Sequence, residues 1–291
     1  MSVKIRHHLL AFISEFVGTF LYLFFAYGGT NVVNSPPKTV ETSNLAADPS
    51  KLLFISLAFG ISLAVNAWVF FRISGGLFNP AVTVALMLVG GASILRGALM
   101  IVAQLIGAIA AAAVVSALFP GALNVATTLV EGTSITRGLF IEMFLTAELI
   151  ITIFMLAAEK HRATFVAPIG IGLSLLIIEM VGVYYTGGSV NPARSLGPCV
   201  VNASFTGYHW IYWLGPVLGS ILASAFYLLL KALNYQTLNP DQDHDGMDIR
   251  RFDIISTDAE KTQTAHSGTP TDADKLTSTP YERGPAIEAG H

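Results

Sequence analysis

Six apolar segments occupy most of this chain, and each is long enough to cross a lipid bilayer as a helix. The hydrocarbon core of a bilayer is about 30 Å thick, which about 20 helical residues can span. Only 12% of the 291 residues are charged and 53% are hydrophobic, whereas a soluble domain carries about 25% charged residues. The sequence therefore predicts an all-α membrane protein. Its six transmembrane helices are expected at about 9–30, 52–72, 93–117, 136–158, 164–184 and 210–233.

Two shorter apolar pieces, at about 80–89 and 192–201, cannot cross the membrane alone. Each follows a similar motif, "SGGLFNPAVT" at 74–83 and "TGGSVNPARS" at 186–195. At 1.5 Å per residue each piece covers about 15 Å, half of a membrane. Non-helical backbone is tolerated at membrane depth only where protein covers it or where it lines a water-filled cavity. We therefore predict two re-entrant half-helices beside a cavity.

The two halves of the chain form an internal repeat. A shift of 112 residues places Gly60 on Gly172 and Asn79 on Asn191. Each half holds three full spans and one half-span, over about 9–117 and 136–233. Because three is odd, the second copy enters the membrane from the opposite side, as in inverted repeats whose discontinuous helices meet at the midplane.

The tips of the half-helices carry the predicted chemistry. Asn79 and Asn191 are expected to cap them, which leaves amide N–H donors that point inward. Two helix N-termini also focus partial positive charge, which opposes cations, including hydronium. We predict a narrow pore for small neutral molecules that excludes ions. The triplets are completed by Pro80, Ala81, Pro192 and Ala193, and proline suits a first helical turn.

Charge near the span ends predicts the orientation. With the N-terminus inside, seven Lys or Arg residues face the cytoplasm and three face outward, so both termini are expected in the cytoplasm. Residues 1–8 then form a cytoplasmic N-terminus and 9–233 a channel domain. The polar composition of 234–291 predicts a disordered cytoplasmic tail.

Several functions are excluded by what the sequence lacks. A net charge of -3 gives no indication of nucleic-acid binding. The single cysteine, Cys199, rules out an internal disulfide framework or a multi-cysteine metal site. Because no nucleophile–base set or metal-ligand spacing is found, we expect neither an enzyme nor a cofactor or metal.

Several stretches of the chain match a known pattern: "SEFVGTF", "LAFGISLAV", "ISGGLFNPAVT", "AQLIGA", "APIGIGLSL", "YYTGGSVNPARS" and "HWIYWLGPVLG". Through them the chain resembles the major intrinsic protein family, specifically the aquaporins, over about residues 9–233. The stretch "LNYQTLNPDQD" resembles fungal members. The resemblance implies a homotetramer with one pore per subunit, situated in the plasma membrane. Transport would be facilitated diffusion without bond chemistry.

The resemblance also implies roles for individual residues. Asn79 and Asn191 would be the central donors of the pore. Arg194, Phe59 and the backbone carbonyl of Gly188 would belong to an outer constriction that selects solutes. Loop support, through hydrogen bonds from the non-helical segments, is implied for Glu15 and Glu142. Ser195 and the pair Tyr212–Trp213 resemble the water-selective branch.

One residue departs from the family pattern. Water-selective members carry His 12 residues before the second Asn, where this chain has Glu179. Our hypothesis is that Glu179 lines the constriction and pairs with Arg194, which would alter pore width and admit solutes such as hydrogen peroxide or ammonia. The alternative is that Glu179 turns aside and leaves an ordinary water pore.

Three functions follow from these observations. The first is a passive water channel that excludes ions and protons. The second is a broader facilitator for small neutral solutes, or a proton-linked pathway through Glu179. The third is a structural membrane protein with a mostly closed pore.

Overall fold

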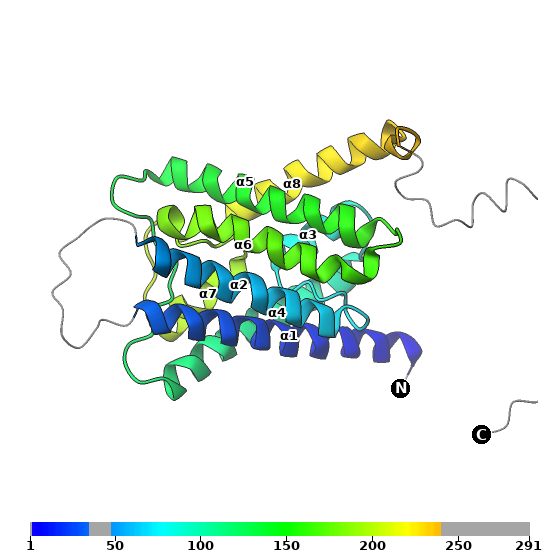
Figure 1. Ribbon diagram of the computed structural model, residues 1–291. Helices are drawn as coiled ribbons and strands as arrows, with labels where there is room; N and C mark the ends of the chain where they lie inside the picture. The colour runs from blue at the N-terminus through cyan, green and yellow to red at the C-terminus, as the bar shows by residue number, and fades with distance from the viewer. Residues whose placement is uncertain (1, 35–47, 240–291) are drawn as a thin grey trace, which may run out of the picture. The chain divides into compact units, whose positions relative to one another are not determined.

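The computed structural model describes residues 2–34 and 48–239, which form an all-helical bundle (Figure 1). Six of its helices are long and apolar enough to cross a membrane. They are α1 (Val3–Asn34), α2 (Pro49–Phe70), α4 (Ile94–Leu118), α5 (Ile135–Ile153), α6 (Ala167–Thr186) and α8 (Ile211–Ala232). Two short helices, α3 (Pro80–Leu88) and α7 (Pro192–Val201), stand where the half-helices were predicted. The predicted fold class is confirmed.

The boundaries differ from the prediction at several ends. α1 begins at Val3 rather than near residue 9, because no glycine or proline interrupts the polar stretch before the span. α5 continues into a π-helical turn, η1 (Phe154–Ala158), and a 3₁₀ turn, η2 (Thr164–Val166), precedes α6. A further 3₁₀ turn, η3 (Tyr235–Thr237), lies in the segment predicted to be disordered from 234. The rest of that predicted tail, 240–291, lies outside the described residues.

Helix packing repeats between the two halves. α1 packs on α4 as α5 packs on α8, and α3 packs on α8 as α7 packs on α4. α2 and α6, which are equivalent in the two halves, pack extensively on each other. Figure 1 shows α3 in one half of the bundle and α7 in the other. This is the arrangement that an inverted repeat requires, in which each half-helix packs against the last long helix of the opposite half.

Glycines allow the long helices to cross closely. A Cβ on Gly60 of α2 would lie 2.7 Å from the carbonyl oxygen of Gly172 in α6, its repeat-related partner. A Cβ on Gly107 would lie 2.7 Å from the Phe16 carbonyl oxygen of α1. Small residues at such crossings let helix backbones approach one another in membranes. The close approach keeps the bundle tight around the segments at its centre.

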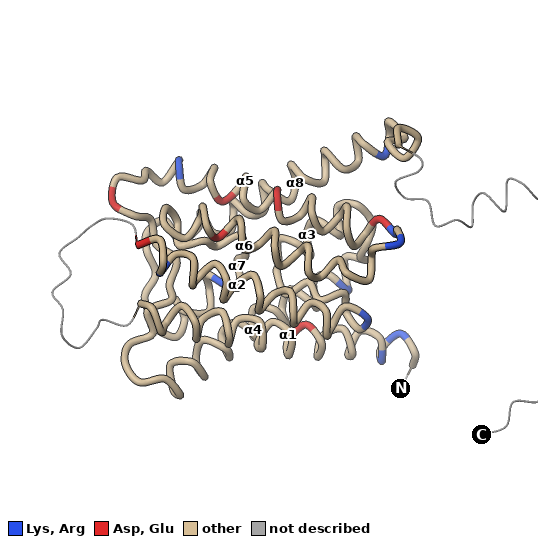
Figure 2. Tube along the Cα trace, viewed as in Figure 1, with Lys and Arg blue, Asp and Glu red and all other residues tan. Residues whose placement is uncertain are grey.

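Charged residues gather at the ends of the bundle. Figure 2 shows most of the blue Lys and Arg positions at the end that holds the N-terminus. The C-terminal end of α8 lies at this same end, as an even number of crossings requires. Figure 2 also shows a few acidic positions within the bundle. Because an uncompensated carboxylate is costly inside a membrane, these residues are candidates for a structural or functional role.

Candidate functional site

The two half-helices are capped by asparagines, as predicted. Asn79 has extended backbone (φ -150°), and its Oδ1 accepts a hydrogen bond from the Ala81 N–H at 2.9 Å. Asn191 (φ -153°) caps α7 in the same way, and its Oδ1 accepts from the Ala193 N–H at 2.9 Å. Each cap is followed by proline at the first helical position, where no backbone N–H is needed.

The capping amides also connect the two halves. Nδ2 of Asn79 donates to the Val190 carbonyl at 2.8 Å, and Nδ2 of Asn191 donates to the Phe78 carbonyl at 2.9 Å. The half-helix tips therefore meet, and each asparagine bonds to the residue just before the other. Because an amide carries two N–H donors, one N–H of each asparagine is used in this link and one remains. The sequence did not reveal this reciprocal use.

Two buried glutamates hold the non-helical segments. Glu15 of α1 accepts from the N–H groups of Leu77 at 3.2 Å and Phe78 at 2.8 Å. In the second half, Glu142 of α5 accepts from Ser189 at 3.0 Å and from Val190 at 2.7 Å. Neither glutamate side chain is exposed. Each therefore satisfies backbone donors that would otherwise be unpaired inside the membrane.

These hydrogen bonds hold unusual backbone in place. Phe78 (φ 50°) and Val190 (φ 43°), the residues that precede the two asparagines, lie in the left-handed region. This conformation is strained for a β-branched or bulky residue and persists only where the surroundings enforce it. It occurs at the same place in both halves, which indicates that the caps and glutamates impose it.

A cavity of about 690 Å³ reaches the asparagine pair from the end of the bundle that carries Arg96 and Lys160. Both asparagines line it, together with Val190. Tyr22 of α1 also lines the cavity and was not singled out in the sequence. The sequence could have indicated this residue, because Tyr22 follows Glu15 by two helical turns and so lies on the same face of α1.

The residues predicted to form a constriction lie together beyond the asparagines. Arg194 in the first turn of α7 is 1% exposed and donates to three backbone carbonyls: Gly188 at 3.0 Å, Val125 at 2.6 Å and Gly187 at 3.3 Å. Its guanidinium carbon lies 4.8 Å from the centre of the Phe59 ring, within the range of a cation–π interaction. Four residues, Phe59, Glu179, Gly188 and Arg194, are called the predicted constriction below.

The family follows from comparison with known proteins. The model of the major intrinsic protein family matches residues 2–227, most of the chain. The chain belongs to this family. Its members are membrane channels rather than enzymes, and this chain is an integral membrane protein with several spans.

Aquaporins of fungi are among its relatives. Aquaporin-7 of Botryotinia fuckeliana is 64% identical over 82% of this chain and 53% of its own length. Probable aquaporin-5 of Gibberella zeae is 53% identical over 85% of this chain and 46% of its own length. The chain thus spans about half the length of these two relatives. It is also 49% identical to aquaporin-8 of B. fuckeliana, over 86% of this chain and 78% of that protein.

A solved structure supports the fold. The aquaglyceroporin from Plasmodium falciparum matches with a TM-score of 0.64 over 76% of this chain and 95% of that chain. At 23% identity, the likeness concerns the fold alone.

The expected ion pair between Glu179 and Arg194 does not form. Neither oxygen of Glu179 has a hydrogen-bond partner among the described residues, and its side chain is fully buried. Three of the five N–H groups of Arg194 donate to backbone carbonyls instead, and these hydrogen bonds fix the position of the guanidinium. The carboxyl instead lies against Gly188, where an added Cβ would overlap Glu179 Oε2.

Several other polar residues have structural partners. Gln104 of α4 donates to Glu15 at 2.8 Å and to Thr83 at 2.9 Å, and so extends the support of the first half-helix.

The single cysteine, Cys199, is buried, with its Sγ 3.6 Å from Nδ1 of His209. No group of three or more metal-ligating side chains occurs in the part of the chain that the structure describes.

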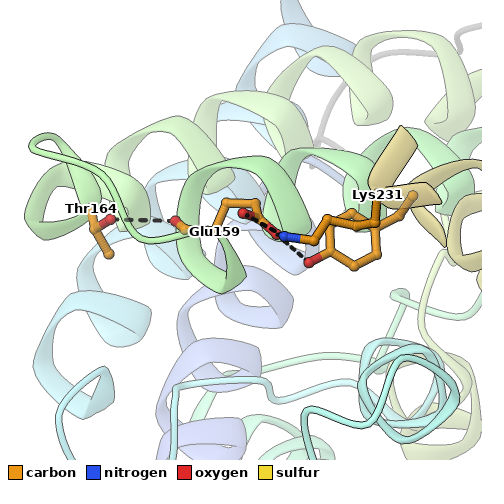
Figure 3. A network of polar contacts seen from close by, with 4 residues as sticks. Glu159, Thr164 and Lys231 are labelled. Atoms are coloured by element: carbon orange, nitrogen blue, oxygen red, sulfur yellow. Dashed lines mark hydrogen bonds and ion pairs between the residues drawn. The ribbon is translucent and has the colours of Figure 1, made fainter. Parts of the chain in front are cut away.

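A polar network lies at the end of the bundle that carries Lys160 (Figure 3). Glu159 follows η1, forms an ion pair with Lys231 of α8 at 3.1 Å and accepts a hydrogen bond from Tyr227. Its backbone carbonyl also accepts from Thr164. Partial burial raises the pKa of Glu159, but the hydrogen bonds from Tyr227 and Lys231 outweigh it, so the pKa lies below its ordinary value. The network ties the segment after α5 to α8.

Proposed function

We propose that this protein is a passive channel for water that excludes ions and protons. One observation carries the proposal: the amides of Asn79 and Asn191 meet at the joined half-helix tips and line the cavity. The remaining amide donors would orient a passing water by its oxygen, and the two helix N-termini would repel cations at the same place. In this proposal Pro80, Ala81, Pro192 and Ala193 build the two tips.

The predicted constriction would filter solutes. Arg194 supplies a fixed positive charge and spare N–H donors, and Phe59 narrows one side. Gly188 has no side chain and so leaves room for the Glu179 carboxyl. In aquaporin-type channels generally, selectivity depends on pore diameter, on the donors that line the pore and on electrostatic barriers such as an arginine. We expect the passage beside the Phe59 ring and Arg194 to be narrow enough to admit water and to exclude the bulkier glycerol.

The proposal also covers the residues that hold the half-helices and the orientation of the chain in the membrane. Glu15 and Glu142 keep the non-helical segments in shape, and 9–233 act as one channel domain. Both termini face the cytoplasm, which is supported by the Lys and Arg positions near the N-terminal end of the bundle. The plasma membrane and a homotetramer with one pore per subunit rest on the family resemblance.

Osmotic shrinkage of reconstituted vesicles, followed by stopped-flow light scattering, tests this function. We expect shrinkage well above that of bare lipid, without glycerol uptake and without dissipation of a pH gradient. Leu175→Trp places an indole on the cavity wall and should abolish the added water flux. Leu173→Trp on the same helix, where the side chain is 57% exposed, should leave it intact. Equal water flux in the protein-containing and bare vesicles would contradict the proposal.

A further inference from the structure

The backbone carbonyl of Arg194 lacks the hydrogen bond that a helix ordinarily supplies. In an α-helix the carbonyl of one residue accepts from the N–H of the residue four positions later. Four residues after Arg194, inside α7, stands Pro198, and proline has no N–H. Arg194 is almost fully buried. A buried carbonyl without a donor is costly, so another part of the chain has to provide one.

The hydroxyl of Tyr27 in α1 provides this donor. It donates to the Arg194 carbonyl oxygen at 2.7 Å, and the Tyr27 side chain is fully buried. Gly197 leaves space for the contact, because an added Cβ there would lie 3.1 Å from the Tyr27 oxygen and 2.6 Å from the Ala108 carbonyl oxygen. Pro198 therefore removes the local donor, and Gly197 allows α1 to bring in a replacement.

The ring of Tyr27 also lies close to the guanidinium of the same arginine. Cζ of Arg194 is 5.6 Å from the centre of the Tyr27 ring and 4.8 Å from the centre of the Phe59 ring. Both distances are within the range of a cation–π interaction. Tyr27 thus acts on Arg194 at its backbone and at its side chain.

The outer end of α1 reaches the guanidinium by a second route. Asn31 and Asn34 are three residues apart and so lie on one face of the helix. Oδ1 of Asn31 accepts from the Asn124 N–H at 2.8 Å, and Nδ2 of Asn34 donates to the Asn124 carbonyl at 2.6 Å. The next carbonyl, that of Val125, accepts from the Arg194 guanidinium at 2.6 Å. One helix therefore fixes the arginine at both of its ends.

We propose that Tyr27 is a positioning residue that sets the width of the predicted constriction by holding Arg194 at a fixed distance from Phe59. A group that selects a ligand has to be held within about 0.5 Å of its working position by packing and by supporting hydrogen bonds. Without the hydroxyl, displaced positions of the arginine become more populated, and these admit a solute larger than water, such as glycerol. This inference rests on the proposed function, because it concerns the selectivity of the same pore.

Tyr27→Phe tests the inference, because it keeps the ring and removes only the hydroxyl. The full chain is reconstituted in vesicles. Water permeability is measured by light scattering and glycerol entry by uptake of labelled glycerol, each after subtraction of the bare-lipid value. One hydrogen bond corresponds to about a fivefold change in a population, so the ratio of glycerol to water permeability should rise about fivefold. A variant that merely folded less well would lose both fluxes in proportion and keep the ratio.

The control is Tyr185→Phe, which removes a hydroxyl from an exposed tyrosine of α6. It should keep the wild-type ratio of glycerol to water permeability. A rise as large as that of Tyr27→Phe would contradict a specific role of the Tyr27 hydroxyl.

The cause is tested by returning the missing donor to α7. Pro198→Ala gives this position an N–H that can donate to the Arg194 carbonyl, as the Ser195 N–H donates to the Asn191 carbonyl one turn earlier at 3.2 Å. In the Tyr27→Phe background it should bring the ratio back to within about twofold of the wild type. Pro198→Ala alone should leave the ratio unchanged, because a carbonyl oxygen has two lone pairs and can accept from both donors.

The outcomes separate this inference from the proposed function. Rapid water flux with the same ratio in wild type and Tyr27→Phe would overturn the inference and leave the water channel standing. So would a raised ratio that Pro198→Ala does not lower. If Tyr27→Phe does not fold, the double variant should fold and select like the wild type, and its failure to do so would also overturn the inference. Absence of water flux in the wild type would overturn the proposed function and this inference with it.

Discussion

At the scale of single residues, the two halves use the same side chains to cap the half-helices and to hold the backbone that precedes them. Asn79 and Asn191 form the caps. Glu15 and Glu142 accept hydrogen bonds from the strained residues just before the two asparagines. The caps could be predicted from the Asn-Pro pattern, because proline at the first position and asparagine before it have local physical reasons. The predicted ion pair between Glu179 and Arg194 was wrong. Sequence spacing indicated that the two residues lie near each other, but it could not show that three N–H groups of Arg194 donate to backbone carbonyls instead.

Glu142→Gln tests the support of the second half-helix. The variant replaces an acceptor oxygen by an amide N–H beside the N–H groups of Ser189 and Val190, so buried donors lose their acceptor. We expect a loss of stability of about 1–3 kcal/mol, measured as the shift in thermal unfolding in detergent. Glu148→Gln on the same helix is exposed and should unfold like the wild type. Equal unfolding of both variants would show that the hydrogen bonds to Glu142 do not hold the loop.

At the scale of helices, hydropathy located each span but not each end. The span signal marks only the part in lipid, so α1 starts earlier than predicted because nothing in "VKIRHH" breaks a helix. The π-helical turn η1 has no sequence signal of its own, since its five residues are apolar and suit an α-helix equally well. The half-helices were located well, because Pro and Asn mark their starts and their lengths fit half a membrane.

Gly60→Ala tests the crossing of α2 and α6. The new methyl group would lie 2.7 Å from the Gly172 carbonyl oxygen and 2.6 Å from Leu176 Cβ, so the helices must separate. Overpacking of this kind costs about 1–3 kcal/mol, which should appear as a lower unfolding temperature. Gly207→Ala is the control, because nothing lies within 4 Å of its added Cβ. A Gly60→Ala protein as stable as the Gly207→Ala protein would contradict the close crossing.

The network around Glu159 predicts a dependence of stability on pH. Its pKa is lower in the folded protein than its ordinary value of 4.5. The stabilising contribution is therefore present above pH 4.5 and is lost as the pH falls through the lower folded pKa. Thermal unfolding of wild type and Glu159→Gln should differ at pH 6 to 7, by a small amount because the pair with Lys231 is partly exposed, and should converge on acidification. A difference that grows at low pH would contradict this assignment.

At the scale of the whole molecule, the repeat in the sequence was enough to predict the topology. Three and a half spans per copy require opposite insertion, and the paired contacts of α1 with α4 and α5 with α8 follow that symmetry. Symmetry also explains why the two tips meet: each asparagine bonds to the equivalent residue of the other half. The solutes were not predictable to the same depth, because selectivity depends on which donors and acceptors remain unpaired after packing. The sequence does not show, for example, that the carboxyl of Glu179 has no hydrogen-bond partner among the described residues.

The most direct measurement is an experimental structure of the protein in lipid at a resolution that shows ordered water. We predict a single file of waters through the bundle, with one water within hydrogen-bond distance of Nδ2 of both Asn79 and Asn191, and the file continuing past Arg194. Asparagine tips separated from each other, or tips covered by protein with no water beside them, would contradict the channel.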